Sequence, residues 1–318
     1  PFMKSYFLIS AFCGLVSGVI FVFTPLSSIA LVLFIKYFSI LPLLYSALGL
    51  GLVPTLLGTA LGTLIALIFS NLNSTFYYVI VFCVPALFIA RFSLLSRNLD
   101  NQQKEWYPIG YILSILIVFS SLLFLVLSIV ALMNNPSLLD LLENIVKNYF
   151  IYSYGDSPYL LNELSQIEND FPNIYRIVAA MTPALLVFSW IIMVIINACF
   201  AQFLLFINKK NIRPSPKYSE IYLPNYQIII LLAAVLITFL GENASFIGKT
   251  LTTINSVPFF VTGLALLHFI TRQWSMRLMT MMAIYFMLIV TMPLSLIVVT
   301  IIGIFDHLFS YKLKKIKT

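Results

Sequence analysis

Long apolar stretches, separated by short polar or proline- and glycine-rich breaks, occupy almost the whole chain. A helix that crosses the hydrocarbon core of a membrane needs roughly 20 predominantly apolar residues. The pattern marks ten candidate spans, at 5–23, 26–48, 50–69, 75–91, 109–133, 177–207, 225–241, 247–270, 276–292 and 293–310. We therefore predict an all-α fold: a polytopic transmembrane helical bundle that forms a single membrane domain over residues 1–318.

The number of crossings depends on two places in this pattern. The second stretch contains Lys36 and Pro42, and only Met292 and Pro293 separate the last two stretches. We expect about 8–10 transmembrane spans for this reason.

Composition supports a membrane protein and excludes a water-soluble globule. Hydrophobic residues make up 61% of the chain and charged residues only 9%, whereas soluble domains carry about 25% charged residues. The formal charge of +7 comes from basic residues in short segments between apolar stretches. Because nucleic-acid binding needs basic residues clustered on one folded face, no nucleic acid partner is expected. The lipid bilayer is the expected partner.

Lysine and arginine are distributed unevenly between the two sides that these spans would define. With a cytoplasmic N-terminus, fourteen of the eighteen basic residues lie on the cytoplasmic side and three on the opposite side. Cytoplasmic loops carry this excess in membrane proteins. Both termini are therefore predicted to be cytoplasmic, which requires a break in the last apolar stretch at Pro293.

The longest connection, at 134–176, holds six of the eleven acidic residues and is predicted to be external. Its apolar residues recur at helical spacing over Pro136–Phe150 and again after Ser157-Pro158. We expect two short amphipathic helices on the outer surface. They would form either a lid that only shields the bundle or a gate over a ligand cavity.

Small residues form stripes on two of the predicted helices. Ser10, Gly14 and Gly18 recur every four residues on the first, and Gly58 and Gly62 repeat that spacing on the third. Small residues at this spacing let another helix backbone approach closely. The first stripe is therefore a candidate helix-docking surface, either for packing within the chain or for a separate membrane subunit.

Four polar side chains within the apolar stretches are candidate ligand-binding residues. Lys36 lies deep in a stretch, where an ionisable group is costly; it either contacts a ligand or extends its amine to the membrane surface. Amide side chains in membrane helices often hydrogen-bond to another helix, so a structural role competes with ligand binding. The candidates are Lys36, Asn197, Gln202 and Asn255.

The predicted cytoplasmic connection between 91 and 110 is rich in basic and aromatic residues. Trp and Tyr favour the headgroup level, and Arg attracts lipid phosphates. The segment is predicted either to anchor the protein at the membrane surface or to serve as a loop that faces a partner. Its candidate residues are Arg91, Arg97, Glu105, Trp106 and Tyr107.

Motifs for catalysis do not occur in the sequence. Neither an HExxH zinc motif nor a GxSxG nucleophile with triad partners is present, and the apolar stretches hold no acidic pair. Cys13, Cys83 and Cys199 lie in apolar stretches without metal-ligand spacing. We therefore expect no enzyme activity, no catalytic residues, no cofactor and no metal.

A distinctive pair of motifs lies around the predicted cytoplasmic connection: Ala90–Arg97, sequence ARFSLLSR, followed by Glu105-Trp106-Tyr107-Pro108 and Gly110. Further distinctive segments are Pro183–Leu186, Ser189-Trp190, Asn197, Ala201-Gln202, Arg213–Pro216, Pro258–Phe260, Gly263–Ala265, and Gly303 with Asp306. Together these motifs resemble those of the YybS-like family of bacterial membrane proteins, in its proteobacterial branch.

The resemblance implies a multi-pass protein of the bacterial cytoplasmic (inner) membrane, in a family without an assigned biochemical role. That family is distantly similar to the substrate-binding components of energy-coupling-factor transporters and to the rod-shape protein MreD. The first similarity implies a component that binds or transports a small molecule and docks on a membrane partner subunit. The second implies a non-transport scaffold for envelope or signalling partners. A cavity lined by the polar candidates would favour the first, and a solidly packed bundle the second.

Overall fold

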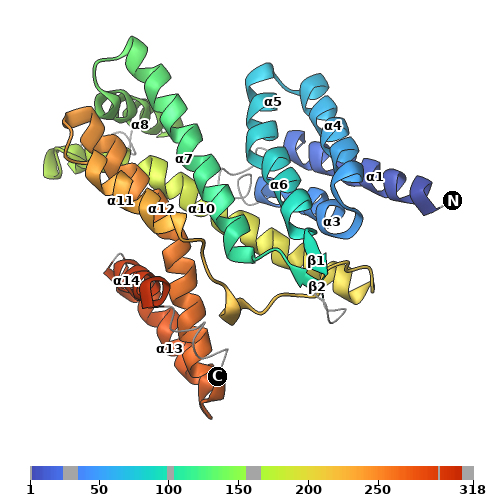
Figure 1. The fold of residues 1–318 in the computed structure, drawn as a ribbon. Coiled ribbons are helices and arrows are strands. Elements are labelled where there is room, and N and C mark those ends of the chain that lie inside the picture. Colours follow the sequence, from blue (N-terminus) through green and yellow to red (C-terminus); the bar gives the residue numbers. More distant parts are fainter. Residues whose placement is uncertain (1, 24–34, 99–103, 155–165, 293, 310–318) are drawn as a thin grey trace. The chain divides into compact units, whose positions relative to one another are not determined.

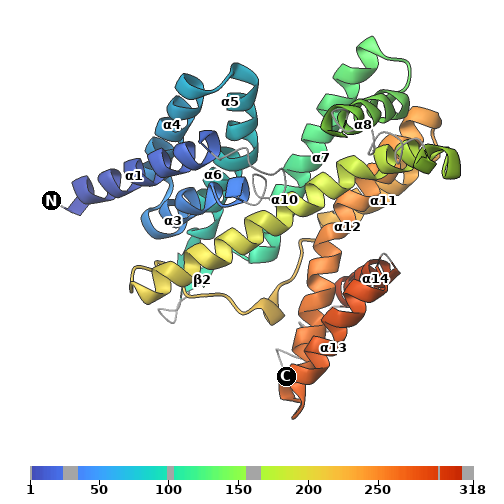
Figure 2. The same ribbon diagram turned by 180° about the vertical axis from the view of Figure 1, so that it is seen from behind.

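The computed structural model describes residues 2–23, 35–98, 104–154, 166–292 and 294–309, and their fold is almost entirely helical (Figures 1 and 2). The helices are α1 (Phe2–Val22), α3 (Ile40–Leu50), α4 (Leu52–Phe69), α5 (Leu72–Tyr78), α6 (Val84–Ser93), α7 (Ile109–Asn134), α8 (Leu138–Tyr154), α10 (Ile174–Ile207), α11 (Tyr226–Ile237), α12 (Glu242–Ile270), α13 (Arg277–Val290) and α14 (Leu294–Phe309). A π-helical turn, η1 (Val79–Cys83), joins α5 to α6, and 3-10 turns lie at η2 (Tyr218–Glu220) and η3 (Thr271–Gln273).

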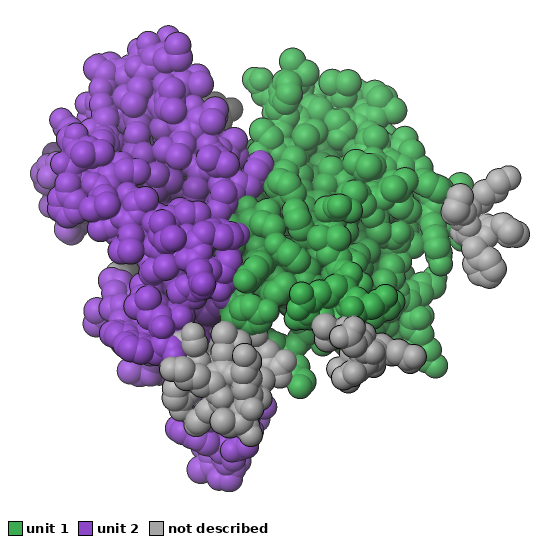
Figure 3. All heavy atoms as spheres, in the orientation of Figure 1, with its two compact units in different colours: residues 1–116, 190–222 green, residues 117–189, 223–318 purple. Residues whose placement is uncertain are grey.

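Two compact units divide the described chain, and Figure 3 colours them separately. Unit 1 comprises residues 1–116 and 190–222, and unit 2 comprises residues 117–189 and 223–318. The long helices α7 and α10 each contribute one part to each unit.

In unit 1, α1 packs along α4 at glycine positions. A Cβ atom added at Gly14 would lie 1.9 Å from the carbonyl oxygen of Gly58, so the two backbones are in direct contact. Hydroxyl groups bind across neighbouring helices at the same level: the Ser17 Oγ donates to the Ser39 carbonyl at 2.6 Å and lies 2.7 Å from the Tyr78 hydroxyl. Small residues and hydroxyls together hold apolar helices in lipid, where no hydrophobic force joins them.

In unit 2, α12 and α14 cross in the same way. A Cβ at Gly303 would lie 1.9 Å from the carbonyl oxygen of Phe259, and one at Gly263 would lie 2.1 Å from that of Val299. The fully buried Phe259 ring lies in an apolar cluster with Leu223 and Leu231. Close backbone contact and aromatic packing therefore build the core of this unit.

The described apolar helices overlap the predicted spans, and they form a group of long helices and a group of short ones. Six helical segments are long and apolar enough to cross a membrane: Ser5–Val22, Leu52–Phe69, Leu72–Ser93, Ile109–Asn134, Ile174–Ile207 and Glu242–Gln273. Four apolar helices are shorter: Ile35–Leu50, Tyr226–Ile237, Arg277–Val290 and Leu294–Phe309. A helix rises about 1.5 Å per residue, so these four are shorter than the hydrocarbon core of about 30 Å. Eight to ten crossings stay a prediction.

The connection between α6 and α7 contains strands. It contains an antiparallel hairpin of two short strands, β1 (Ser96–Asn98) and β2 (Lys104–Trp106), in which Arg97 faces Glu105. The all-α class is confirmed, and this hairpin is a local exception that the sequence did not predict, because a strand of three residues is too short to show periodicity.

In the first half of 134–176 a helix is present where one was predicted, since α8 covers Leu138–Tyr154. Its place on the outer surface stays a prediction. The second predicted helix begins at Ser157, and this start lies outside the described residues, as does the first part of the predicted span at 26–48. The predicted break in the last apolar stretch is present, because α13 ends at Val290 and α14 begins at Leu294.

Candidate functional site

Unit 1 contains a cavity of about 380 Å³, within the 300–1,000 Å³ typical of ligand pockets. It lies between α3, α6, the first turns of α7, the last turns of α10 and the connection that follows α10. Its apolar walls include Ile89, Ile112, Leu113, Leu116, Val194 and Phe203. The cavity is therefore suited to an apolar group the size of a small molecule.

Helix α10 contributes one wall of the cavity through residues that share one helix face. Val194, Ala198 and Gln202 recur every four residues and therefore share one helix face. Ala198 has the smallest side chain of the three and leaves room between bulkier neighbours. Cys199, which is exposed, lines the same cavity.

Polar groups are concentrated at one part of the cavity lining. The Gln202 Nε2 donates a hydrogen bond to the Arg213 carbonyl at 2.8 Å, and it lies 3.5 Å from the Ser215 Oγ. The Arg213 guanidinium donates from Nη1 to the carbonyl of Ser93 at 3.1 Å. Gln202 thus fixes the backbone of the segment that follows α10. This segment places the Arg213 guanidinium in the lining of a mostly apolar cavity.

Arg213 lies in an electrostatically unusual position. Its side chain is half-buried, and burial lowers the pKa of the guanidinium below its usual value. Its charged carbon lies 5.9 Å from the centre of the Trp106 ring, within the range of a cation–π contact. No carboxylate of the described residues lies within ion-pair distance of it. Sequence reasoning missed this residue as a binding candidate: it counted Arg213 among the basic residues that mark topology and among the segments that carry the family resemblance.

Of the candidate residues in the connection between 91 and 110, Trp106 contacts a residue of the cavity lining, and three of the others make contacts elsewhere. Arg97 and Glu105 form an ion pair across the hairpin, and Trp106 lies against Arg213. Tyr107 packs between Phe92 and Tyr111, with ring centres 5.6 Å and 5.7 Å away. Arg91 is exposed near the end of α6 and is not part of the cavity lining. The hairpin therefore reaches the cavity through Trp106.

The candidate helix-docking stripe lies inside unit 1. Ser10 is fully buried, and its hydroxyl lies 2.7 Å from the Ser46 hydroxyl. Gly14 and Gly18 face α4, where a Cβ at Gly18 would lie 2.8 Å from the Gly62 carbonyl oxygen. The stripe therefore packs within the chain, against the second stripe on α4.

Two of the predicted ligand residues in unit 1 are not part of the cavity lining. Asn197 is 2% exposed and donates to the carbonyls of Tyr37 at 3.1 Å and Met193 at 2.9 Å, so it ties α10 to the segment before α3. The Lys36 amine lies 5.1 Å from the centre of the Phe21 ring. Of the four candidates, only Gln202 lines the cavity.

Asn255 belongs to a buried polar chain in unit 2. Its Nδ2 donates to the Ser121 Oγ at 3.0 Å, and its Oδ1 accepts from the Gln227 Nε2 at 3.2 Å. The chain connects α12 to α7 and α11. Asn255 therefore joins three helices, which is the structural role that amides often have in membrane helices.

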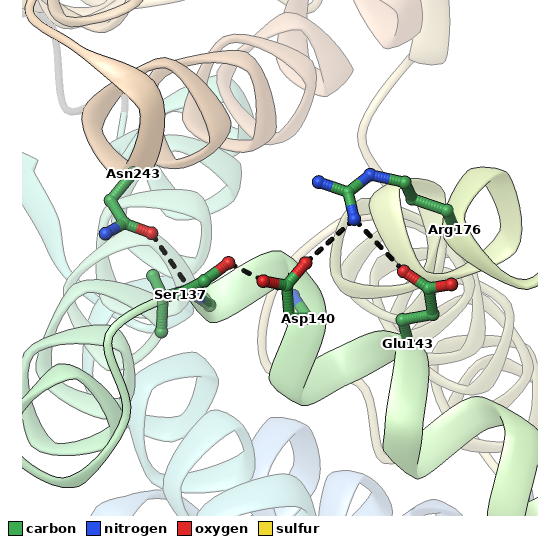
Figure 4. A network of polar contacts seen from close by, with 6 residues as sticks. Ser137, Asp140, Glu143, Arg176 and Asn243 are labelled. Atoms are coloured by element: carbon green, nitrogen blue, oxygen red, sulfur yellow. Dashed lines mark hydrogen bonds and ion pairs between the residues drawn. The ribbon is translucent and has the colours of Figure 1, made fainter.

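A second polar network, in unit 2, fastens the start of α8 (Figure 4). The Asn243 side chain donates to the Pro136 carbonyl at 2.8 Å and accepts from the Leu138 amide at 3.1 Å. The Arg176 Nη1 lies 2.8 Å from Asp140 and 3.2 Å from Glu143. Hydrogen bonds with Ser137 and Arg176 hold the pKa of the Asp140 carboxyl below its usual value. The network attaches an amphipathic helix, and its carboxylates are already paired.

The sequence was also compared with known proteins. Residues 13–307 match the model of a family described as "Predicted membrane protein (DUF2232)". No curated protein and no solved structure matches the chain. Among the residues that the structure describes, no group of three or more His, Cys, Asp or Glu side chains could hold a metal ion.

Proposed function

The chain belongs to the DUF2232 family of predicted membrane proteins, and from this premise we propose that it binds an amphipathic small molecule in the cavity of unit 1. One observation carries the proposal: the cavity combines mostly apolar walls with a cluster of polar side chains, Gln202, Arg213 and Ser215. Ligand sites have this composition, because apolar walls supply affinity and a few placed polar groups fix orientation.

The arrangement favours an amphiphile over a polar solute. The walls are formed by aliphatic and aromatic side chains of four helices, α3, α6, α7 and α10, whereas the hydrogen-bonding groups lie at one part of the lining. A polar solute would leave most of its hydrogen-bonding groups unpaired in such a space, at a cost of about 1–3 kcal/mol each. A molecule with an apolar chain and one polar group avoids that cost.

Two finer forms of the function follow from the sequence. A small-molecule-binding or transport component of the bacterial inner membrane is favoured by the presence of Gln202 in the cavity lining. Transport would require a membrane partner subunit that supplies energy, because the sequence provides no nucleotide-binding motif. The alternative, a membrane scaffold without a ligand, predicts that this cavity is dispensable.

Native mass spectrometry of protein extracted from its own membrane in mild detergent tests the proposal. Ala198→Phe fills the cavity from α10, and Cys199→Trp blocks it from a neighbouring lining position. Ile196→Phe is the matched control, because Ile196 lies on the same helix, is 54% exposed and does not line the cavity. Size-exclusion chromatography checks that each variant is folded.

We expect a bound amphiphile on the wild type and on Ile196→Phe, and its loss from both blocking variants. Equal adducts on all folded variants would contradict the proposal. A wild type without any small-molecule adduct, copurifying with envelope proteins, would favour the scaffold.

A further inference from the structure

We propose that the cavity of unit 1 selects an amphiphile with an anionic headgroup, a carboxylate or a phosphate monoester, and that Arg213 is the residue that recognises it. This inference rests on the proposed function, because it specifies the ligand class of the same cavity. It concerns the polar end of the lining, where Arg213, Ser215 and Gln202 lie together.

The first argument is charge balance. The Arg213 guanidinium is half-buried, and among the described residues no carboxylate lies within 4.0 Å of it. Removing a charge from water without a counter-charge is unfavourable, and a partly buried cation is stabilised when an anion binds beside it. A ligand anion would supply the counter-charge that the described chain does not.

The second argument is donor geometry. A guanidinium carries five N–H donors in a planar fork that matches the oxygens of a carboxylate or phosphate. One hydrogen bond uses the Nη1 group, which donates to the Ser93 carbonyl at 3.1 Å. The other N–H groups of this fork make no hydrogen bond within the described residues, and the Ser215 hydroxyl, which also lines the cavity, adds a further donor.

The third argument is preorganisation of the cation. The Arg213 backbone is fixed by the 2.8 Å hydrogen bond from Gln202, and its side chain lies between the Ser93 carbonyl and the Trp106 ring. Pro214 and Pro216 flank Ser215 and restrict the backbone of the connection. A headgroup site held in this way loses little conformational entropy when the ligand binds.

The test uses a fluorescent acid and its neutral counterpart, dansylaminoundecanoic acid and its methyl ester, with the full-length protein in detergent. Both probes carry the same apolar chain, so they differ only in headgroup charge. Arg213→Gln removes the cation, and Lys210→Gln removes a charge from the same connection at a position that does not line the cavity. Ala198→Phe reports whether either probe occupies the cavity at all.

We expect wild-type protein to bind the acid about tenfold or more tightly than the ester, which is the effect of one charge-assisted hydrogen-bond pair. Arg213→Gln should abolish this preference, because it weakens binding of the acid much more than binding of the ester, whereas Lys210→Gln should keep the preference. Competition with decanoate and with decyl phosphate then identifies the headgroup, and stronger competition by either anion than by decanol supports the inference.

Equal binding of acid and ester by the wild type would overturn the inference, as would an equal loss of both probes in a folded Arg213→Gln variant. Both of these results leave the proposed function intact as long as Ala198→Phe blocks the ester. If Ala198→Phe changes neither probe, the proposed function itself fails. The two failures are therefore distinguishable in one set of titrations.

Discussion

Gln202 and Arg213 are joined by a hydrogen bond of 2.8 Å from the Gln202 side chain to the Arg213 backbone carbonyl. This bond fixes the segment that follows α10 to the last turns of that helix. The segment carries Arg213, the one arginine among the described residues of the cavity lining. The bond is a contact within unit 1 and links a predicted candidate to a residue that sequence reasoning missed.

Gln202→Leu should loosen this connection while leaving α10 intact. The lost hydrogen bond is worth about 0.5–1.5 kcal/mol. Trypsin cleavage after Lys209, Lys210 and Lys217 should therefore become faster, while cleavage at other sites stays unchanged. Unaltered cleavage in the connection would show that the bond does not hold Arg213 in place.

Gly14→Ala should destabilise unit 1, because the added methyl group would lie 1.9 Å from the Gly58 carbonyl oxygen. Overpacking of this kind costs about 1–3 kcal/mol. Thermal unfolding in detergent measures the effect, with Leu8→Ala as the control on α1, since Leu8 is 71% exposed. A Gly14→Ala protein as stable as the control would contradict the close helix contact.

Asn255 and Gln227 should show energetic coupling in unit 2. Asn255→Ala leaves the Gln227 Nε2 and the Ser121 hydroxyl without the partners they have in the structure, at a cost of about 0.6–2 kcal/mol. Gln227→Leu combined with Asn255→Ala should cost less than the sum of the single changes. Strict additivity in a double-mutant cycle would argue against the polar chain.

Acid should release the start of α8. The pKa of the Asp140 carboxyl lies below its ordinary value of 3.8, because Ser137 and Arg176 hydrogen-bond to it. A lowered folded-state pKa stabilises the attachment above the ordinary value, and this contribution is lost as the pH falls through the folded-state pKa. Proteolysis within 138–154 should therefore stay slow from pH 7 to about pH 4 and accelerate below that.

Asp140→Asn should remove this acid transition, and its proteolysis at neutral pH should already be faster than that of the wild type. Asp170→Asn is the matched control, because Asp170 is exposed and belongs to no ion pair among the described residues. An identical pH profile for Asp140→Asn and the wild type would assign the transition to other groups.

The helices could be predicted from the sequence because each needs only a local run of apolar residues. Both small-residue stripes were also visible, at Ser10, Gly14 and Gly18 and at Gly58 and Gly62. The packing of one stripe against the other could not be predicted, because identical spacing on two helices does not indicate which helix each stripe contacts. The structure shows that the two stripes meet each other.

The cavity could be predicted only in part. Gln202 was recognisable as an amide in an apolar stretch, whereas Arg213 lies in a basic connection where such residues usually mark topology. Its role depends on a contact with Ser93, which is 120 residues away in the chain. Long-range packing of this kind has no local signature, and the same holds for the hairpin that brings Trp106 to Arg213.

Protection of Cys199 from a membrane-permeable maleimide is the most direct test of the central claim that the cavity holds a ligand. Cys199 is exposed and lines the cavity, whereas Cys13 and Cys83 are 8% and 2% exposed. The reagent should therefore label the native protein at Cys199, and Cys199→Ser should remove the signal. Saturating dansylaminoundecanoic acid is predicted to slow this labelling severalfold. Labelling at an unchanged rate would contradict the account.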